Sequence, residues 1–300
     1  VNGTSVTTAD LQASNGVVHL VDGVLLETVD AVDRATLTPQ LSTIADAIAG
    51  AGLAGSNSPL RNETLTLFAP ADGSFDGLDL GALTSNTDLL GRILQYHAVP
   101  GSRITSDQIA GGETPITLEG GTLDIAVNNG TVTVNGIPVT TTDIETENAT
   151  IHLIDGVLLQ RIDIVDRASI TEGLGTLASA VQAAGLDASD SPLRNDDPVT
   201  VFAPVDGAFE SLDVGELTGN SEILNRVLPY HVVSGAVTSD QLSSGDVQTL
   251  EGGSITVQVG DDGVTVNGIP VTTTDIQTRN GVVHVIDGVL LRRTTAVQRA

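Results

Sequence analysis

Apolar residues recur at helical spacing in two stretches of the chain, residues 37–53 and 170–186. Small residues fill most of the other positions, and each stretch ends on Gly-Leu, a composition that suits a helix C-terminus. The pattern therefore predicts that an amphipathic helix opens each of two similar units. Further short helices are expected at residues 86–95 and 220–228.

Two short apolar runs, LTLFAP at residues 65–70 and VTVFAP at residues 199–204, are typical of buried strands. Proline has no N–H to give to a strand ladder, so we expect these strands to end at Pro70 and Pro204.

The second half of each unit, from about residue 114 to 160 and from 247 to 292, alternates apolar and polar residues. In each half two alternating runs meet at an Asn-Gly pair, at Asn135 and at Asn267, which favours a tight type I′ β-hairpin. Helices followed by a meander of hairpins predict an α+β unit whose sheet is buried on one face by the helices.

An internal repeat organises the whole chain, because VNGIPVTTTDI begins at Val134 and again at Val266, a period of 132 residues. The unit bodies repeat as well: LTLFAPADGSF returns as VTVFAPVDGAF, and ILQYHAVPG returns as VLPYHVVSG. The first residues are a third copy of the closing part, and residues 294–300 match the start of a unit. The predicted domains are a C-terminal fragment of an upstream domain (1–26), two complete domains (27–159 and 160–292) and the start of a further one (293–300).

Three separated motifs, FAP-x-DGxF, a Tyr-His pair and a closing xHxIDGVLL strand, recur in this order and together resemble the fasciclin domain family. The resemblance covers the whole chain and implies tandem fasciclin-like domains, each a β-wedge sheet packed with an N-terminal group of helices. It also implies a role in cell adhesion and extracellular matrix. The motif residues expected to be structural are Phe68, Pro70, Phe75, His152, Asp155, Phe202, Pro204, Phe209, His284 and Asp287. Gly73 and Gly207 depart from the polar residue common in the family, which puts in doubt whether a relative's binding surface is present.

The net charge of the chain limits the classes of molecule that it can bind. Thirty-eight acidic residues face twelve basic ones, for a net charge of −26, and such a chain is repelled by nucleic acid and by anionic lipid. All basic residues are Arg, and Asp outnumbers Glu, a balance that resembles proteins of halophiles. No apolar run approaches the 18 or so residues of a membrane span, so we expect no membrane insertion in this segment.

Three of the five histidines, His19, His152 and His284, share one position of the closing strand. The Asp of each motif, such as Asp155 or Asp287, lies three residues further on, so on a strand the two side chains face opposite sides and form no compact pair. We expect each His to hydrogen-bond the backbone of an adjacent element, and each Asp to cap a turn. No nucleophile elbow, phosphate-binding loop or zinc motif is present, so we expect a protein that is not an enzyme and has no cofactor or metal.

The Tyr96-His97 and Tyr230-His231 pairs each follow an apolar run and precede Pro-Gly or Ser-Gly. The resemblance implies that this segment takes part in integrin-type adhesion, with the surroundings of the pair as the contact surface. The alternative is that each Tyr belongs to the core, with its hydroxyl satisfied internally.

The sequence thus predicts a secreted or cell-surface adhesion or matrix-interaction module. Its partner would be a cell-surface or matrix protein, a polysaccharide or another copy of itself. The alternative is a passive stalk that presents another domain, which is favoured slightly because all six aromatics stand at core-like positions. Binding of a small apolar molecule between helices and sheet is a minor alternative.

Overall fold

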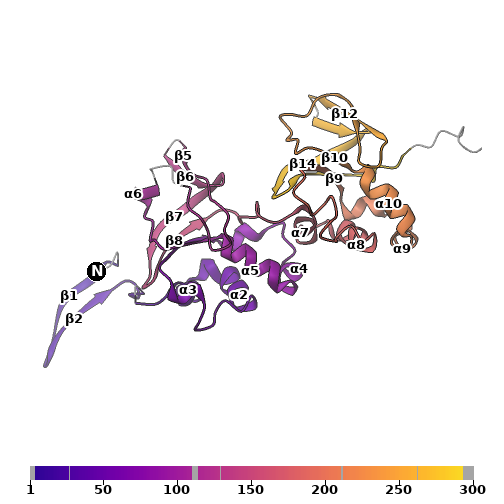
Figure 1. Cartoon of the computed structure of the whole chain (residues 1–300). Helices are drawn as coiled ribbons and strands as arrows, with labels where there is room; N and C mark the ends of the chain where they lie inside the picture. Colours follow the sequence, from indigo (N-terminus) through magenta and orange to yellow (C-terminus); the bar gives the residue numbers. More distant parts are fainter. Residues whose placement is uncertain are drawn as a thin grey trace, which may run out of the picture. The chain divides into compact units, whose positions relative to one another are not determined.

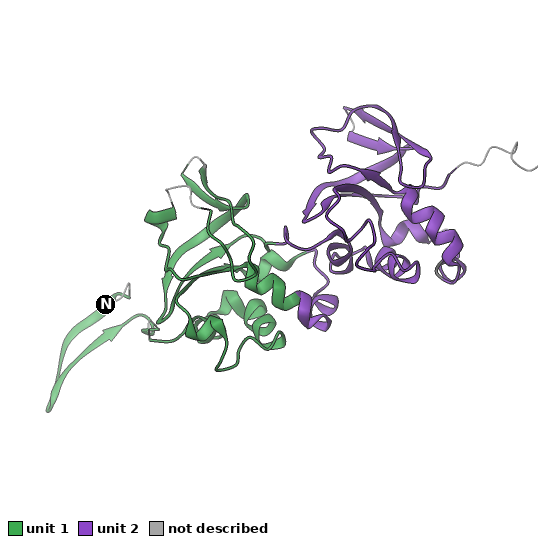
Figure 2. Ribbon diagram, in the orientation of Figure 1, with its two compact units in different colours: residues 1–76, 90–158 green, residues 77–89, 159–300 purple. Residues whose placement is uncertain are grey.

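The chain forms two compact units, shown in Figure 2: unit 1 contains residues 1–76 and 90–158, and unit 2 contains residues 77–89 and 159–300. The computed structural model describes residues 4–26, 28–109, 114–128, 130–210, 212–261 and 263–292. The predicted domain start at 293–300 lies outside the described residues. The domain boundaries inferred from the repeat stay a prediction.

Each unit opens with helices, as the apolar periodicity predicts. The helical elements of the first repeat are α1 (Ala31–Leu37), η1 (Pro39–Leu41), α2 (Ser42–Gly50), α3 (Pro59–Asn62), η2 (Asp72–Phe75), α4 (Leu80–Ser85), α5 (Thr87–Tyr96) and α6 (Ser106–Ile109). Those of the second are α7 (Ile164–Ser169), α8 (Gly175–Ala183), η3 (Asp206–Phe209), α9 (Val214–Thr218) and α10 (Ser221–Tyr230).

The opening helix is broken in two, whereas the sequence predicted one continuous helix at 37–53. Helix α1 begins at Ala31 because the Asp30 side chain caps it by accepting a hydrogen bond from Asp33 N. It ends at Leu37, since Thr38 takes an extended conformation before Pro39, whose ring disfavours a helical residue in front of it. In the second repeat, where 170–186 was predicted, the break coincides with Gly173 at φ 79°.

Apart from the N-terminal hairpin, the strands of each repeat form one sheet. The first has the order β4 (Ala98–Pro100), β3 (Leu65–Pro70), β8 (Ala149–Ile154), β7 (Ile137–Glu145), β6 (Thr131–Val134) and β5 (Ile125–Asn128). The second has the order β10 (Val232–Ser234), β9 (Val199–Pro204), β15 (Gly281–Ile286), β14 (Ile269–Thr278), β13 (Gly263–Val266), β12 (Ser254–Gly260) and β11 (Gly245–Gln248).

The FAP runs are confirmed as buried strands that end at their prolines, and both lie inside a sheet. Strand β3 pairs in parallel with β8, and β9 with β15, so each unit brings the two ends of its sequence together. The predicted Asn-Gly turns are confirmed too: Asn135 and Gly136 have φ of 48° and 81°, and the ladder closes on the pair Val134 and Ile137.

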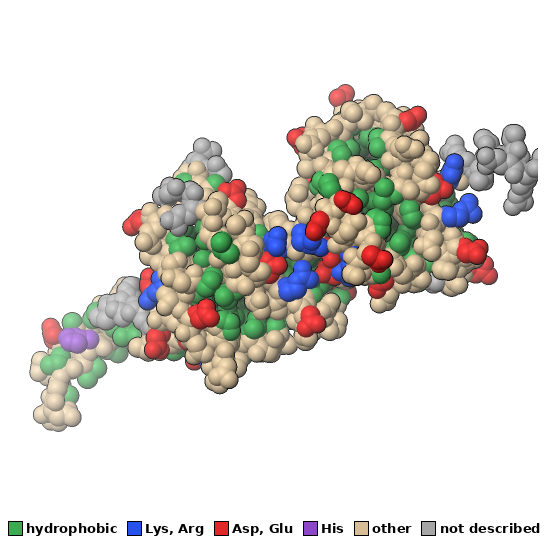
Figure 3. All heavy atoms as spheres, in the orientation of Figure 1, with side chains coloured by type: hydrophobic (Ala, Val, Ile, Leu, Met, Phe, Trp, Pro, Cys, Tyr) green, Lys and Arg blue, Asp and Glu red, His purple; other side chains and the backbone are tan. Residues whose placement is uncertain are grey.

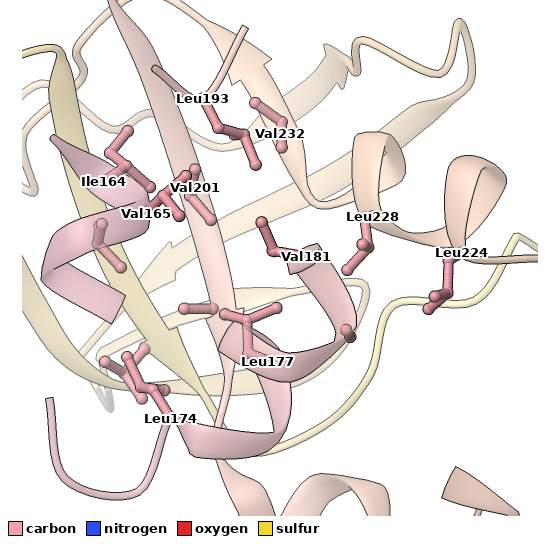
Figure 4. Close-up of a cluster of buried hydrophobic side chains, with 14 of the residues drawn as sticks. Ile164, Val165, Leu174, Leu177, Val181, Leu193, Val201, Leu224, Leu228 and Val232 are labelled. Atoms are coloured by element: carbon pink, nitrogen blue, oxygen red, sulfur yellow. The ribbon is translucent and has the colours of Figure 1, made fainter. Parts of the chain in front are cut away.

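The central strands are buried on both faces, whereas the sequence predicted burial by helices on one face only. In unit 2, helices α7, α8 and α10 cover one side, where Leu177 and Leu228 approach Val201 of β9 (Figure 4). On the other side, Phe202 and Ile286 pack with the apolar residues of β12 and β13. The β-meander curls back over its own sheet and so covers the second face of the central strands. Figure 1 shows α2, α3 and α5 gathered on one side of the first sheet, with α6 apart from them beside β5, and α7, α8, α9 and α10 gathered on one side of the second sheet.

Residues 77–89 belong to the first repeat in sequence but pack within unit 2. Leu78 forms an antiparallel bridge with Thr171, and Asp79 N donates to Ile170 O at 2.9 Å. Glu172 N donates to Gly77 O, also at 2.9 Å.

A separate hairpin precedes the first helix. It consists of β1 (Val6–Ala13) and β2 (Gly16–Val21), which pair with each other in a two-stranded sheet.

Candidate functional site

The tyrosine of the Tyr-His pair lies at the end of a helix with its hydroxyl inside the unit. Tyr96 is buried, and its hydroxyl donates to Thr122 O at 3.0 Å and accepts from Asn135 Nδ2 at 2.8 Å. Asn135 is the first residue of the type I′ turn, so the tyrosine ties helix α5 to the hairpin tip. In unit 2, Tyr230 makes the same two contacts, with Ser254 O at 2.8 Å and Asn267 Nδ2 at 3.3 Å.

The histidine of the pair is fully enclosed and neutral. His97 Nε2 accepts a hydrogen bond from Leu158 N at 2.9 Å, so the ring proton is on Nδ1, which donates to Ile93 O at 2.8 Å. Burial lowers the pKa of His97 to about 4, and the hydrogen bond to Ile93 opposes this only in part. His231 makes the same contacts with Leu290 and Val227, and burial lowers its pKa to about 4 as well.

These contacts agree with the interpretation of the tyrosine as a core residue with an internally satisfied hydroxyl. Because the side chains of Tyr96, His97, Tyr230 and His231 are all buried, a partner could touch only the residues around them. The expectation that this segment is adhesive stays a prediction about those surroundings.

The histidine of the closing strand also has its contacts inside the unit. His152 is buried, with Nε2 2.8 Å from Ile104 O and its ring stacked on Phe68 at a centroid distance of 5.5 Å. His284 has the equivalent contacts with Val237 O and Phe202. The expected backbone hydrogen bond of this histidine is therefore present in both units. Burial lowers the pKa of His152, which keeps it neutral.

A serine and an aspartate complete this arrangement, and the sequence reasoning did not identify them. Asp143 adopts φ 60° and its N–H donates to His152 Nδ1 at 3.3 Å. Its carboxylate accepts from Ser106 N at 2.8 Å and from Ser106 Oγ. Burial alone would raise the pKa of Asp143, but the Ser106 hydrogen bonds and the nearby His152 lower it below its usual value. The sequence signal that could have identified Asp143 is the motif TTTDI, which is repeated without change in the two units and ends here at Ile144.

Ser106 and His152 do not form a nucleophile and base. Ser106 Oγ is bound to a carboxylate, and both ring nitrogens of His152 are bound to backbone groups, so no proton relay connects the hydroxyl to the imidazole. The cluster instead fastens the loop that begins α6 onto the β7–β8 hairpin. Unit 2 repeats it with Ser239, Asp275 and His284.

The remaining motif residues have structural positions. The aromatics Phe68, Phe75, Phe202 and Phe209 are buried. Asp155 and Asp287 are exposed at the turn after the closing strand, where their backbone N–H groups donate to Pro138 O and Pro270 O. The backbone N–H, rather than the carboxylate, makes the contact across this turn.

An open groove of about 1020 Å³ lies beside Tyr230 in unit 2. Its lining is mostly uncharged and consists of Tyr230, the polar side chains of Ser254, Thr256, Gln258 and Asn267, three glycines, four aliphatic side chains and Arg292.

In the described part of the chain, no group of three or more His, Asp and Glu side chains is arranged to hold a metal ion. None of the described helices has the length and apolar character required to cross a bilayer.

Comparison with known proteins gives a family match. The model of the fasciclin domain matches residues 39–160 and 172–292. A solved structure, a FAS1 domain pair from the insect cell adhesion molecule fasciclin I, aligns with 87% of this chain and 96% of that chain at 17% identity and a TM-score of 0.42.

Curated relatives include proteins from animals and bacteria. The chain is 30% identical over 299 residues to transforming growth factor-beta-induced protein ig-h3 of Sus scrofa, covering 97% of this chain and 42% of that protein. It is 29% identical over 293 residues to human periostin, covering 91% of this chain and 32% of that protein. It is 41% identical over 133 residues to the Synechocystis protein sll1483, covering 43% of this chain and 72% of that protein. The chain thus spans less than half the length of these two animal relatives.

Proposed function

Because this chain belongs to the fasciclin domain family, which matches it over two long stretches, we propose that it is a non-catalytic adhesion module that acts outside the cell. Each unit presents a surface to a cell-surface or matrix protein or polysaccharide, and the two units act together. The module is secreted or held at the cell surface.

The observation that carries this proposal is the internal use of the buried histidine and tyrosine side chains that recur in both units. The two buried histidines of unit 1, His97 and His152, have both ring nitrogens bound to backbone groups, and Tyr96 is bound through its hydroxyl. A site whose acids and bases are all committed to holding the fold offers binding surface rather than proton transfer.

The groove beside Tyr230 is the surface that we assign to the partner. Its Ser, Thr and Gln side chains offer hydrogen-bonding groups without charge, which fits the hydroxyl groups of a polysaccharide or the backbone of a protein loop. It lies next to the Tyr-His pair, as the sequence analysis anticipated for the contact surface. Because the chain has a net charge of −26, we expect the groove to bind acidic polymers only at high salt, where the repulsion is screened.

Two units in one chain strengthen weak contacts. When the first unit is bound, the second samples the same matrix at a high local concentration, so avidity exceeds the affinity of one unit. An adhesion module therefore needs only a modest site in each unit.

Equilibrium binding of the labelled chain to cell envelopes and to matrix polysaccharide, at low and at molar salt, tests the proposal. We expect saturable binding that unlabelled chain displaces. The substitution Gln258→Arg places a long charged side chain in the groove and should weaken binding about tenfold or more. The matched variant Gln277→Arg changes an exposed glutamine of β14 outside the groove and should bind as the parent does.

Absence of saturable binding by the folded chain at either salt concentration would reject the adhesion proposal. Equal losses in the two glutamine variants would locate the contact elsewhere and reject the groove.

A passive stalk is the second candidate, and one observation favours it. All six aromatic side chains of the chain, Phe68, Phe75, Tyr96, Phe202, Phe209 and Tyr230, are buried. Protein interfaces are enriched in exposed tyrosine and tryptophan, which this chain does not offer. A folded chain that binds no surface would support the stalk.

A further inference from the structure

One buried asparagine side chain closes unit 2 by joining segments that are far apart in the sequence. Asn280 is 2% exposed. Its Oδ1 accepts a hydrogen bond from Ile164 N at 3.0 Å, and its Nδ2 donates to Leu193 O at 2.9 Å. The amide thus ties the start of α7 and the segment before β9 to the start of the closing strand β15. Both bonds require an amide, because one partner only donates and the other only accepts.

The residue that follows this asparagine has to be a glycine. A β-carbon at Gly281 would lie 1.9 Å from Val199 O, far inside the contact distance of two atoms. The backbone of β9 is held in this place, because Val199 N donates to Asn280 O at 3.1 Å. The fold of unit 2 therefore imposes the dipeptide Asn-Gly at residues 280–281.

Asn-Gly is a reactive dipeptide, because glycine has no β-carbon to hinder its backbone nitrogen from approaching the side-chain amide before it. The nitrogen of Gly281 forms a bond to Cγ of Asn280, the bond from Cγ to Nδ2 breaks, and ammonia leaves with the proton of the attacking N–H. Water then opens the cyclic succinimide at either carbonyl. The product is aspartate or isoaspartate in place of asparagine.

We propose that Asn280 is a deamidation site which the folded unit protects, and that its modification in the unfolded chain prevents unit 2 from folding again. In the folded unit the amide is buried and bound at both ends, so the reaction requires that this part of the chain first opens. In the product a carboxylate oxygen faces Leu193 O with no proton between them, which is unfavourable in a buried place. Isoaspartate also adds a carbon to the backbone and so displaces β15 from β9.

The Asn-Gly pair in the turn between β13 and β14 does not have this consequence. Asn267 is exposed, and its Nδ2 donates to the Tyr230 hydroxyl, which is itself able to donate to a carboxylate. Its Oδ1 accepts from Thr256 N at 2.8 Å, as a carboxylate oxygen also does. Aspartate is therefore compatible with the fold at position 267 and incompatible with it at position 280.

Unit 1 has the same closing amide without the reactive dipeptide. Asn148 Oδ1 accepts from Ala31 N at 2.9 Å, and its Nδ2 donates to Leu60 O at 3.0 Å. The next residue is Ala149, whose β-carbon hinders attack by its nitrogen. Prolonged unfolding should therefore damage unit 2 before unit 1. The inference does not depend on the adhesive function, because it concerns refolding and not the groove.

Peptide mapping by mass spectrometry tests the proposal, after the whole chain is incubated at mildly alkaline pH either in guanidinium chloride or folded in molar salt. Trypsin cleaves after Arg279, and the resulting peptide 280–292 contains no other amide side chain. Acidic side chains lie on both units in the face that Figure 3 shows, so refolding is also made in molar salt, which screens their repulsion.

We expect deamidation at residue 280 to be at least about tenfold faster in denaturant than in the folded chain, which reacts only through its open fraction. After dilution from denaturant, the fraction of chains with hydrogen-exchange protection in residues 281–286 should fall as the modified fraction rises.

Three variants separate the parts of the argument. Asn280→Asp introduces the product directly and should lower the unfolding midpoint of unit 2 or leave this unit unfolded. The matched variant Asn267→Asp should refold as the parent does. Ala149→Gly creates an Asn-Gly pair in unit 1, and its Asn148 should deamidate in denaturant at least about tenfold faster than Asn148 of the parent.

Three results would overturn the proposal. The first is equal deamidation at residue 280 in the folded and the unfolded chain. The second is complete refolding of chains that carry the modification. The third is an unfolding midpoint of Asn280→Asp equal to that of Asn267→Asp.

Discussion

His97 Nε2 accepts a hydrogen bond from Leu158 N at 2.9 Å, across 61 residues of sequence, and so joins the end of helix α5 to the segment that follows the closing strand. The bond requires a neutral imidazole, because a protonated ring has no acceptor nitrogen. The same relationship holds in unit 2 between His231 and Leu290 at 2.8 Å.

The first prediction concerns acid. The pKa of His97 and of His231 is about 4 in the folded state, below the ordinary value of 6.5, so the unfolded state binds more protons between these values. Their stabilising effect is present above pH 6.5 and is lost as pH falls through 4. The two values differ by an amount equivalent to about 3 kcal/mol for each histidine. Urea unfolding in molar salt, where carboxylate repulsion is screened, should show this loss.

Replacing His231 by Gln should lower the unfolding free energy at neutral pH. Between pH 6.5 and 4, the unfolding free energy of this variant should decrease less steeply than that of the parent. An unchanged decline would contradict the assignment of a buried neutral histidine.

The second prediction concerns the tyrosine hydroxyls. Tyr96→Phe leaves Thr122 O and Asn135 Nδ2 without their partner and should cost about 1–2 kcal/mol of unfolding free energy. Tyr96→Ala also opens a cavity and should cost about 3–5 kcal/mol. Denaturant unfolding measures both. If Tyr96→Phe reduced binding to a matrix without a change in stability, the hydroxyl would be a contact residue instead.

The third prediction concerns a packing defect in unit 2. A cavity of about 30 Å³ lies between α8, β9 and β15, with Val181, Val201 and Val283 in its wall. The first repeat has the larger residues Ile48, Leu67 and Ile151 at these positions. Val181→Ile restores a methyl group and should stabilise the chain by about 1 kcal/mol. The control Val259→Ile, on an exposed part of β12, should change the unfolding midpoint little. If Val181→Ile destabilised the chain, the wall of the cavity would be too rigid to accept the added methyl group.

The fourth prediction concerns Asp143, which combines a positive φ with the Ser106 contacts. Asp143→Ala loses the acceptor of two hydrogen bonds, and alanine lacks the short polar side chain that helps aspartate to adopt the left-handed region, so the change should cost about 2–3 kcal/mol. Asp143→Asn keeps an acceptor and tolerates that conformation, so it should cost less. Asp124→Ala, an exposed change, is the control, and equal losses for Asp143→Ala and Asp124→Ala would refute the role of the cluster.

The fifth prediction concerns salt. With a net charge of −26 the folded chain repels itself, and screening relieves this. The unfolding midpoint should rise between low and molar salt in thermal scans. A flat response would remove the basis for the halophile-like interpretation.

Sequence periodicity and turn chemistry predicted much of each unit. The FAP strands, helices α5 and α10 and the Asn-Gly turns lie where the pattern placed them, because each depends on neighbours a few residues away. The break before η1 was missed, since helical periodicity continues through Pro39 although its ring does not allow a continuous helix. The sequence pattern also did not predict that the meander curls over its own sheet. Alternation of apolar and polar residues indicates a strand, but it does not show which element covers each face.

The candidate site depended on contacts between distant segments. Ser106 and Asp143 meet across 37 residues and have no common motif. The groove beside Tyr230 is formed by a helix, two turns, two strands and the segment 289–292, which only the folded unit brings together.

The three copies of the closing hairpin show which features the local sequence determines and which depend on tertiary structure. In each copy the local sequence determined the bulge, the positive φ of the aspartate and its bond to the histidine, since the same features form in residues 10–19, where the hairpin is exposed. Tertiary structure alone decided that His152 is buried and His19 is half exposed. Burial requires a parallel strand and a helix layer from elsewhere in the chain, and no local pattern can supply them.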